Sequence, residues 1–149
     1  MNTRAGIGAL VVIGLAFCGV GYLGLVAPHA LLGPVGIEWD RLGNTAMNEL
    51  TATYGGMHAA LGVFFLLAAF VPALRLGALW AAAAFLSGLV IGRIVSLVRD
   101  GIPGPMPLAL IVVELMGVLI AVGAVLKRHA PAHTPAAPAP APTTTTPPL

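Results

Sequence analysis

The sequence predicts an all-α integral membrane protein, folded as an up-down bundle of four helices and followed by a disordered C-terminal tail. The chain has 149 residues, of which 58% are hydrophobic and only 8% are charged. That balance leaves too few charged groups to cover the surface of a soluble domain. The apolar residues fall into four runs that are each long enough to cross a bilayer. The residues after the fourth run are rich in proline, alanine and threonine, which cannot build a packed core.

The first expected span covers residues 7–27, an uncharged run of 21 residues. At about 1.5 Å per residue, this run crosses the roughly 30 Å hydrocarbon core of a bilayer. It is longer than the apolar part of a cleavable signal peptide, about 7–15 residues, so we interpret it as a retained span. The polar connection at residues 33–48 places Trp39 among charged residues, which is typical of a segment at the membrane interface.

The remaining spans are expected at residues 51–71, 76–98 and 106–126. Pro72 stops the second span, and the connection after it is too short for anything but a tight helical hairpin. The third connection, RDGIPGP, consists of turn-forming residues. The chain therefore divides into a transmembrane domain, residues 1–128, and a tail, residues 129–149, that we expect to be disordered or loosely polyproline II.

Basic residues outside the apolar runs predict how the bundle is oriented. Four lie on the side of the two chain termini (Arg4, Arg75, Lys127 and Arg128), against two on the opposite side (Arg41 and Arg99). Because basic residues are enriched on the cytoplasmic side, we expect a multi-pass protein of the inner (plasma) membrane with both termini in the cytoplasm.

Small residues recur along the spans at spacings that favour close helix packing. Gly55, Ala59 and Gly62 lie nearly on one stripe, and Gly88 and Gly92 form a small-xxx-small pair. Such stripes let helix backbones approach closely in lipid, where no hydrophobic drive brings helices together. We expect both stripes to contact neighbouring helices.

Several kinds of chemistry lack the residues they need. No basic patch or zinc-ligand spacing indicates nucleic-acid binding. Cys18 is the single cysteine and cannot form an internal disulfide or a Cys-x-x-Cys pair, so we interpret it as a packing residue. No metal-ligand set, cofactor motif or nucleophile paired with a base is present. We therefore expect no metal, no cofactor and no recognised catalytic set.

Titratable residues nevertheless lie well inside the apolar runs, where an unpaired charge would be costly. At about 1.5 Å per residue, Arg93 lies about 9 Å below the end of the third span and Glu114 about 12 Å inside the fourth. His58 lies about 11 Å inside the second span by the same rise. The three depths predict that these groups share one level in the outer half of the membrane and that Arg93 pairs with Glu114.

Helical spacing extends this cluster to further polar residues. Tyr54 and His58 share a face of the second span, and Arg93, Ser96 and Asp100 share a face of the third. Glu114 lies on a stripe of small residues with Gly117, Ala121 and Ala124. The candidate ligand-binding residues are Tyr54, His58, Arg93, Ser96, Asp100, Glu114 and Glu49.

Each candidate also has a structural interpretation. An Arg93–Glu114 contact could simply clamp two helices together. His58 could be a packing histidine rather than one that handles protons. Glu49 could complement the positive N-terminal end of its helix. The sequence leaves these alternatives open.

The polar motifs resemble those of a small bacterial membrane-protein family described as domain of unknown function 4345. The resemblance rests on NELTATYGGMHAALGVFFL (residues 48–66), GRIVSLVRDGIPG (residues 92–104) and Glu114, and it covers about residues 5–128. It implies a four-span protein with these family positions: Glu49, Tyr54, Gly55, Gly56, Gly92, Arg93, Ser96, Asp100, Gly101 and Glu114. More remotely, the architecture is similar to DoxX-type four-helix membrane proteins, some of which are linked to redox complexes.

Three functions remain open at this point. The first is binding of a small polar or amphipathic ligand, or a lipid, in an outward-facing polar cluster within the membrane. The second is a structural or accessory subunit that associates with a second copy or with another membrane protein. The third is a membrane-embedded isomerase-type enzyme with Glu114 or His58 as its acid or base. Membrane lipids are expected partners in every case, and nucleic acid is not.

Overall fold

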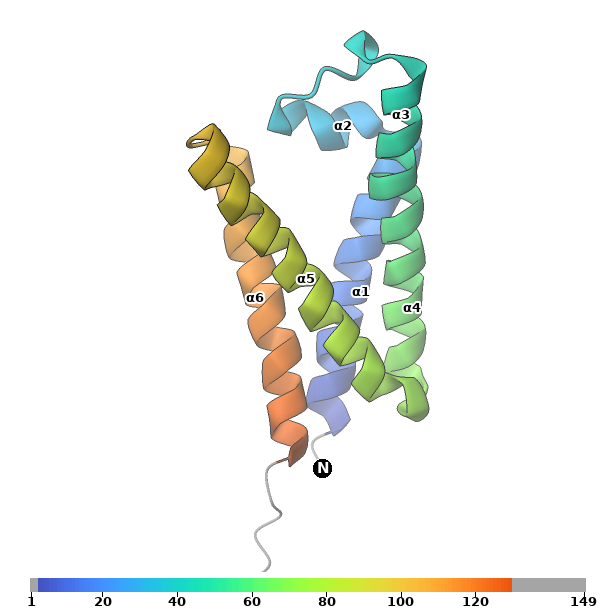
Figure 1. Ribbon diagram of the computed structural model, residues 1–149. Helices are drawn as coiled ribbons and strands as arrows, with labels where there is room; N and C mark the ends of the chain where they lie inside the picture. The colour runs from blue at the N-terminus through green and yellow to red at the C-terminus, as the bar shows by residue number, and fades with distance from the viewer. Residues whose placement is uncertain (1–2, 130–149) are drawn as a thin grey trace, which may run out of the picture.

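A computed structural model describes residues 3–129 of the chain, and within this range the protein is helical without strands. Four helices are long and apolar enough to span a membrane by length and composition, and Figure 1 shows them running up and down beside one another. They are α1 (Thr3–Val26), the continuous rod of α3 (Asn44–Leu50), η3 (Thr51–Met57) and α4 (His58–Phe70), α5 (Pro72–Asp100) and α6 (Pro105–His129). The predicted all-α bundle is confirmed. Residues 130–149 of the expected tail lie outside the described residues.

The two ends of the bundle differ in how they are built. At one end, hereafter the terminal end, α1 begins, α6 ends and Val71 alone separates α4 from α5. At the other, hereafter the loop end, residues 27–43 leave α1 and fold into α2 (Pro28–Leu32) and two short turns, η1 (Gly33–Val35) and η2 (Trp39–Arg41). Figure 1 shows α2 lying across the loop end, and η1 reaches α6. This connection therefore bridges the end of the bundle from α1 toward α6.

The helices extend beyond the apolar runs that predicted them. The continuous helical rod of α3, η3 and α4 begins at Asn44, seven residues before the expected start of the second span at residue 51. Polar residues can complete helical hydrogen bonds outside the apolar stretch, so the helix is longer than the span. Pro72 is the first residue of α5, a position where its fixed φ and missing N–H do no harm. Gly101 ends α5 with φ of +95°, which glycine adopts without strain.

The core lies where all four long helices meet. Its largest fully enclosed side chains come one from each of them: Leu10 of α1, Phe65 of α4, Leu79 of α5 and Val125 of α6. Toward the loop end the helices separate into two pairs, because α1 packs along η3 and α4 while α5 packs along α6. Figure 1 shows these two pairs diverging above the core.

Glycines allow the close contact between α1 and the second rod. A Cβ atom added to Gly21 would lie 2.4 Å from the backbone nitrogen of Ala59, and one added to Gly62 would lie 2.6 Å from the backbone nitrogen of Cys18. The predicted stripe of Gly55, Ala59 and Gly62 is therefore a helix contact, and Cys18 packs within it.

The prediction that Gly88 and Gly92 contact a neighbouring helix is wrong. A Cβ atom added to Gly88 or Gly92 would meet no atom of residues 3–129 within 4 Å beyond its own helix backbone and neighbours. The small-xxx-small spacing marks one face of a helix but does not determine whether another helix covers that face. Here α5 packs on α6 through a different face, where Leu86 lies against Gly117.

Candidate functional site

Arg93 of α5 and Glu114 of α6 form a forked ion pair. Arg93 Nε donates to Glu114 Oε1 at 3.0 Å and to Oε2 at 2.8 Å, and Arg93 Nη2 donates to Oε1 at 2.8 Å. The Glu114 side chain is 9% exposed and that of Arg93 is 29% exposed. The predicted contact between the two residues is present. Charge-assisted bonds from a planar guanidinium to both carboxylate oxygens fix orientation as well as adding energy.

The position of Glu114 follows from the small residues around it. Gly117, nearly one turn further along α6, brings the backbone close to α5, because a Cβ atom there would lie 2.7 Å from Leu86 Cδ1. Ala121 and Ala124 continue the same stripe and are buried. The acid therefore lies on the face of α6 that packs inward, where an unpaired charge would be costly.

His58 is buried, 7% exposed, at the start of α4, and its ring is held on several sides. It stacks on Phe17 at 5.3 Å between ring centroids and on Tyr54 at 5.7 Å, and the edge of Phe85 approaches at 5.9 Å. Nδ1 lies 2.8 Å from the carbonyl oxygen of Thr53. A carbonyl oxygen can only accept, so Nδ1 carries the hydrogen and Nε2 of the neutral ring is an acceptor.

The backbone beside His58 winds more widely than an α-helix. Residues Thr51–Met57 form a π-helix that contains Tyr54, Gly55 and Gly56. Such turns are rare and often occur at functional sites. Sequence reasoning missed this element. The adjacent glycines and a histidine placed to bond the Thr53 carbonyl were the signal that could have indicated it.

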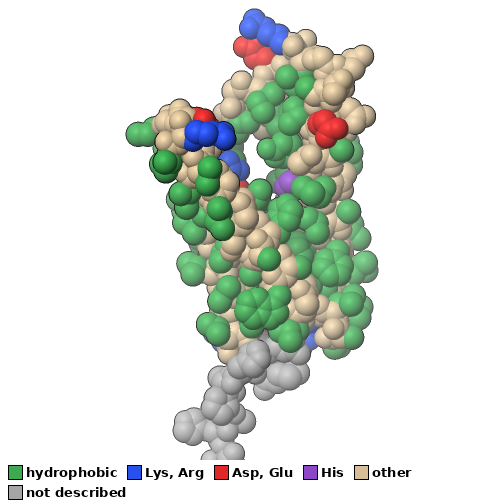
Figure 2. All heavy atoms as spheres, viewed as in Figure 1, with side chains coloured by type: hydrophobic (Ala, Val, Ile, Leu, Met, Phe, Trp, Pro, Cys, Tyr) green, Lys and Arg blue, Asp and Glu red, His purple; other side chains and the backbone are tan. Residues whose placement is uncertain are grey.

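Four of the seven predicted residues form two contacting pairs, Tyr54 stacked on His58 and Arg93 bonded to Glu114. Figure 2 shows a hollow between the α5–α6 pair and the α3–α4 rod, with basic, acidic and histidine side chains gathered around it. We refer to Tyr54, His58, Arg93 and Glu114 as the polar site.

The polar site holds hydrogen-bonding groups that no residue of 3–129 uses. Arg93 bonds Glu114 through Nε and Nη2, which leaves Nη1 with no acceptor. The Tyr54 hydroxyl and His58 Nε2 also have no hydrogen-bond partner within this part of the chain, and His58 Nε2 is not a fully enclosed atom. Two donors and an acceptor of the polar site thus have no partner among the described residues.

The other three predicted residues lie elsewhere. Ser96 Oγ donates to Asp100 Oδ2 at 3.0 Å, and Arg99 donates to both Asp100 oxygens at 2.7 and 2.8 Å. This trio is exposed at the end of α5 and makes no hydrogen bond to Arg93 or Glu114. Glu49 is exposed on α3, without a hydrogen bond or ion pair to any described residue. Sharing a helical face with Arg93 does not bring Ser96 and Asp100 into its contacts.

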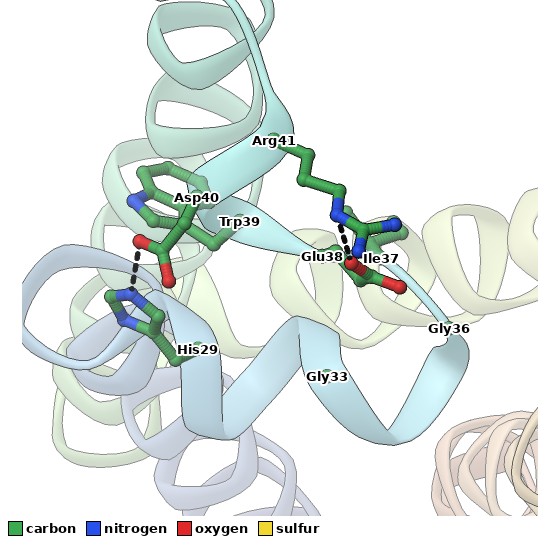
Figure 3. A pocket seen from close by; sticks show the side chains of 8 residues that line it. All are labelled: His29, Gly33, Gly36, Ile37, Glu38, Trp39, Asp40 and Arg41. Atoms are coloured by element: carbon green, nitrogen blue, oxygen red, sulfur yellow. Dashed lines mark hydrogen bonds and ion pairs between the residues drawn. The ribbon is translucent and has the colours of Figure 1, made fainter.

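A surface pocket of about 540 Å³ lies within the loop-end connection. Figure 3 shows two polar pairs in it, His29 with Asp40 at 3.0 Å and Arg41 with Glu38 at 2.6 Å. All four side chains are more than half exposed. Exposed pairs of this kind contribute little to stability. The pocket is formed by one short stretch of chain, residues 29–41, and its polar side chains are exposed, so the candidate site lies elsewhere.

A family model described as Domain of unknown function (DUF4345) matches residues 8–125, which is most of the chain and includes every residue of the polar site. Neither a curated protein nor a solved structure matches the chain.

Proposed function

The chain belongs to the DUF4345 family, and we propose that it binds a small amphipathic molecule within the membrane, in the hollow beside the polar site. The observation that carries this proposal is a fixed set of unused hydrogen-bonding groups beside a buried ion pair. A membrane protein gains nothing in stability from unsatisfied polar groups at this depth, so their retention favours an external partner.

The charge of the polar site restricts the head group of that molecule. Arg93 and Glu114 neutralise each other, so the ion pair favours a neutral ligand over an anion. Arg93 Nη1 offers donors, His58 Nε2 offers an acceptor, and the Tyr54 hydroxyl can do either. A hydroxyl or carbonyl head group matches this set.

The aromatic side chains around His58 suit an apolar or planar body. Phe17 and Phe85 pack against His58, and Tyr54 stacks on it while remaining 36% exposed. Aromatic faces bind flat rings and acyl chains alike. The ligand class that we propose is therefore a neutral membrane amphiphile, such as a lipid or a quinone-like molecule, that enters from the bilayer with its polar head toward Arg93.

We also propose that the hollow opens toward the outer side of the inner membrane and that both termini are cytoplasmic. The support is the excess of basic residues at the terminal end. A second candidate function, an accessory subunit that binds a partner helix, is favoured by the uncovered face of α5 at Gly88 and Gly92.

Native mass spectrometry of the full-length chain in detergent, incubated with a polar lipid extract of the host membrane, tests the ligand proposal. We expect the wild type to retain one neutral amphiphile that Arg93→Ala does not retain. Arg99→Ala is the matched control, because Arg99 is exposed and bonds only Asp100. Identical retention by wild type and Arg93→Ala would contradict the proposal.

A further inference from the structure

Charge is strongly segregated along this chain. The sequence contains seven basic and five acidic residues, and every acid lies between Glu38 and Glu114. Those five acids belong to the loop-end connection, α3, the end of α5 and the polar site. The terminal end carries four basic residues, Arg4, Arg75, Lys127 and Arg128, and no acid.

Arg75 is the buried member of this basic group. It lies in the first turn of α5 and is only 8% exposed. Its Nη2 donates to the carbonyl oxygen of Ala69 at 2.8 Å, near the end of α4. Its Nε is fully enclosed and has no hydrogen-bond partner. Gly6 of α1 makes room for the stem, because a Cβ atom there would lie 3.4 Å from Arg75 Cδ.

The contacts within residues 3–129 satisfy this guanidinium only in part. The carbonyl of Ala69 belongs to the negative end of α4, which favours a cation. No carboxylate pairs with Arg75 in the described chain, and burying a charge without an opposite charge is costly. Nη1 makes no hydrogen bond there either, yet it is not fully enclosed, so it is open to a group from outside.

The surroundings of Arg75 favour an anion from the membrane surface. Arg75 lies about one turn inside the start of a spanning helix, at the level of lipid head groups. Arg4 and Lys127 are exposed at the same end and add positive potential. The first turn of α5 carries no side-chain cap, since Val71 precedes it, so the N–H groups there also attract negative charge.

We propose that Arg75 is the core of a binding site for the phosphate group of an anionic membrane lipid at the terminal end of the bundle. Nη1 donates to a phosphate oxygen, and Arg4 and Lys127 contribute longer-range attraction. The site is separate from the polar site and needs no ligand in the hollow. It supplies the negative charge that the sequence itself does not provide for Arg75.

Lipid retention by the full-length chain tests this assignment. Protein in neutral detergent is offered equal amounts of phosphatidylglycerol and phosphatidylcholine and is examined by native mass spectrometry. We expect the wild type to prefer phosphatidylglycerol by about fivefold or more. Arg75→Gln should lose most of that preference, and Arg75→Lys should keep part of it. Arg4→Gln, an exposed control at the same end, should have a smaller effect than Arg75→Gln.

Three outcomes would overturn the proposal. Equal retention of the two lipids by the wild type would do so without any variant, even if Arg75→Gln does not fold. A preference that survives in Arg75→Gln would show that Arg75 only caps α4. Inorganic phosphate that binds as tightly as phosphatidylglycerol would assign the site to the free anion instead of the lipid.

Discussion

Partly buried Arg93 and buried Arg75 lie in opposite halves of the same helix, and their charges are balanced differently. Arg93 bonds Glu114 in a forked ion pair in the half of the bundle where α5 and α6 lie apart from α1 and α4. Arg75 lies where the helices converge, and it has a backbone carbonyl but no acid as its partner. At the closed end the described chain supplies no counter-charge for Arg75, whereas the open end balances its charges and keeps hydrogen-bonding groups unused.

The close contact between α1 and α4 should be the part of the molecule that tolerates substitution least. Gly21→Leu would place side-chain atoms on the backbone of Ala59, where a Cβ alone would lie 2.4 Å away, so we expect no folded protein. Gly88→Leu is the matched control, because nothing of the described chain lies near that glycine, and it should fold normally. The yield of folded protein and its thermal unfolding in detergent are measured for both variants. A stable Gly21→Leu protein would contradict the packing.

The second prediction compares the buried pair with the exposed trio at the end of α5. Glu114→Gln leaves Arg93 without its counter-charge and should lower the free energy of unfolding by roughly 3–5 kcal/mol. Asp100→Asn removes an exposed acid from Arg99 and should change stability little. Both are measured by thermal or denaturant unfolding in detergent. Equal losses of stability from the two changes would show that burial does not make the Arg93–Glu114 pair more important for stability than the Arg99–Asp100 pair.

The third prediction concerns the ring of His58. His58→Phe keeps an aromatic ring between Phe17 and Tyr54 but leaves the Thr53 carbonyl without its ring donor. We expect a loss of about 1–2 kcal/mol in unfolding free energy and a loss of ligand retention. An unchanged stability, measured in the same detergent, would argue against the hydrogen bond to Thr53.

The smallest effect on stability is expected at Tyr54. Tyr54→Phe removes only a hydroxyl that bonds no described residue, so the unfolding free energy should change by less than about 0.5 kcal/mol. Retention of the neutral amphiphile should nevertheless fall, because the ligand loses one hydrogen bond. Native mass spectrometry compares retention by Tyr54→Phe with retention by Tyr22→Phe, a change at an exposed tyrosine of α1. Only Tyr54→Phe should reduce retention.

The sequence predicted the fold and the central pair because both depend on properties of single helices. Apolar run length determined the four spans, and counting depth along two of them placed Arg93 opposite Glu114. The stripe at Gly55 and Gly62 was predictable for a similar reason, since small residues on one face mark close packing.

The remaining features depend on how helices lie relative to one another. α5 diverges from α4 toward the loop end, and no described residue covers Gly88; no spacing within one helix encodes either feature. Ser96 shares a helical face with Arg93 yet bonds Asp100, because it lies past the level at which α6 carries its acid. The π-helix was also missed, since an extra residue in a turn leaves the hydrophobic pattern almost unchanged.

The most direct test of the proposed function separates a ligand site from a clamp. The double variant Arg93→Met, Glu114→Gln removes both charges with little change in size, which should leave stability near that of the wild type or raise it. Stability and retention of the neutral amphiphile are measured on the wild type, the double variant and Glu114→Gln. We predict that the double variant folds and loses the amphiphile. A double variant that folds and retains it as the wild type does would contradict the site and leave the pair as a clamp.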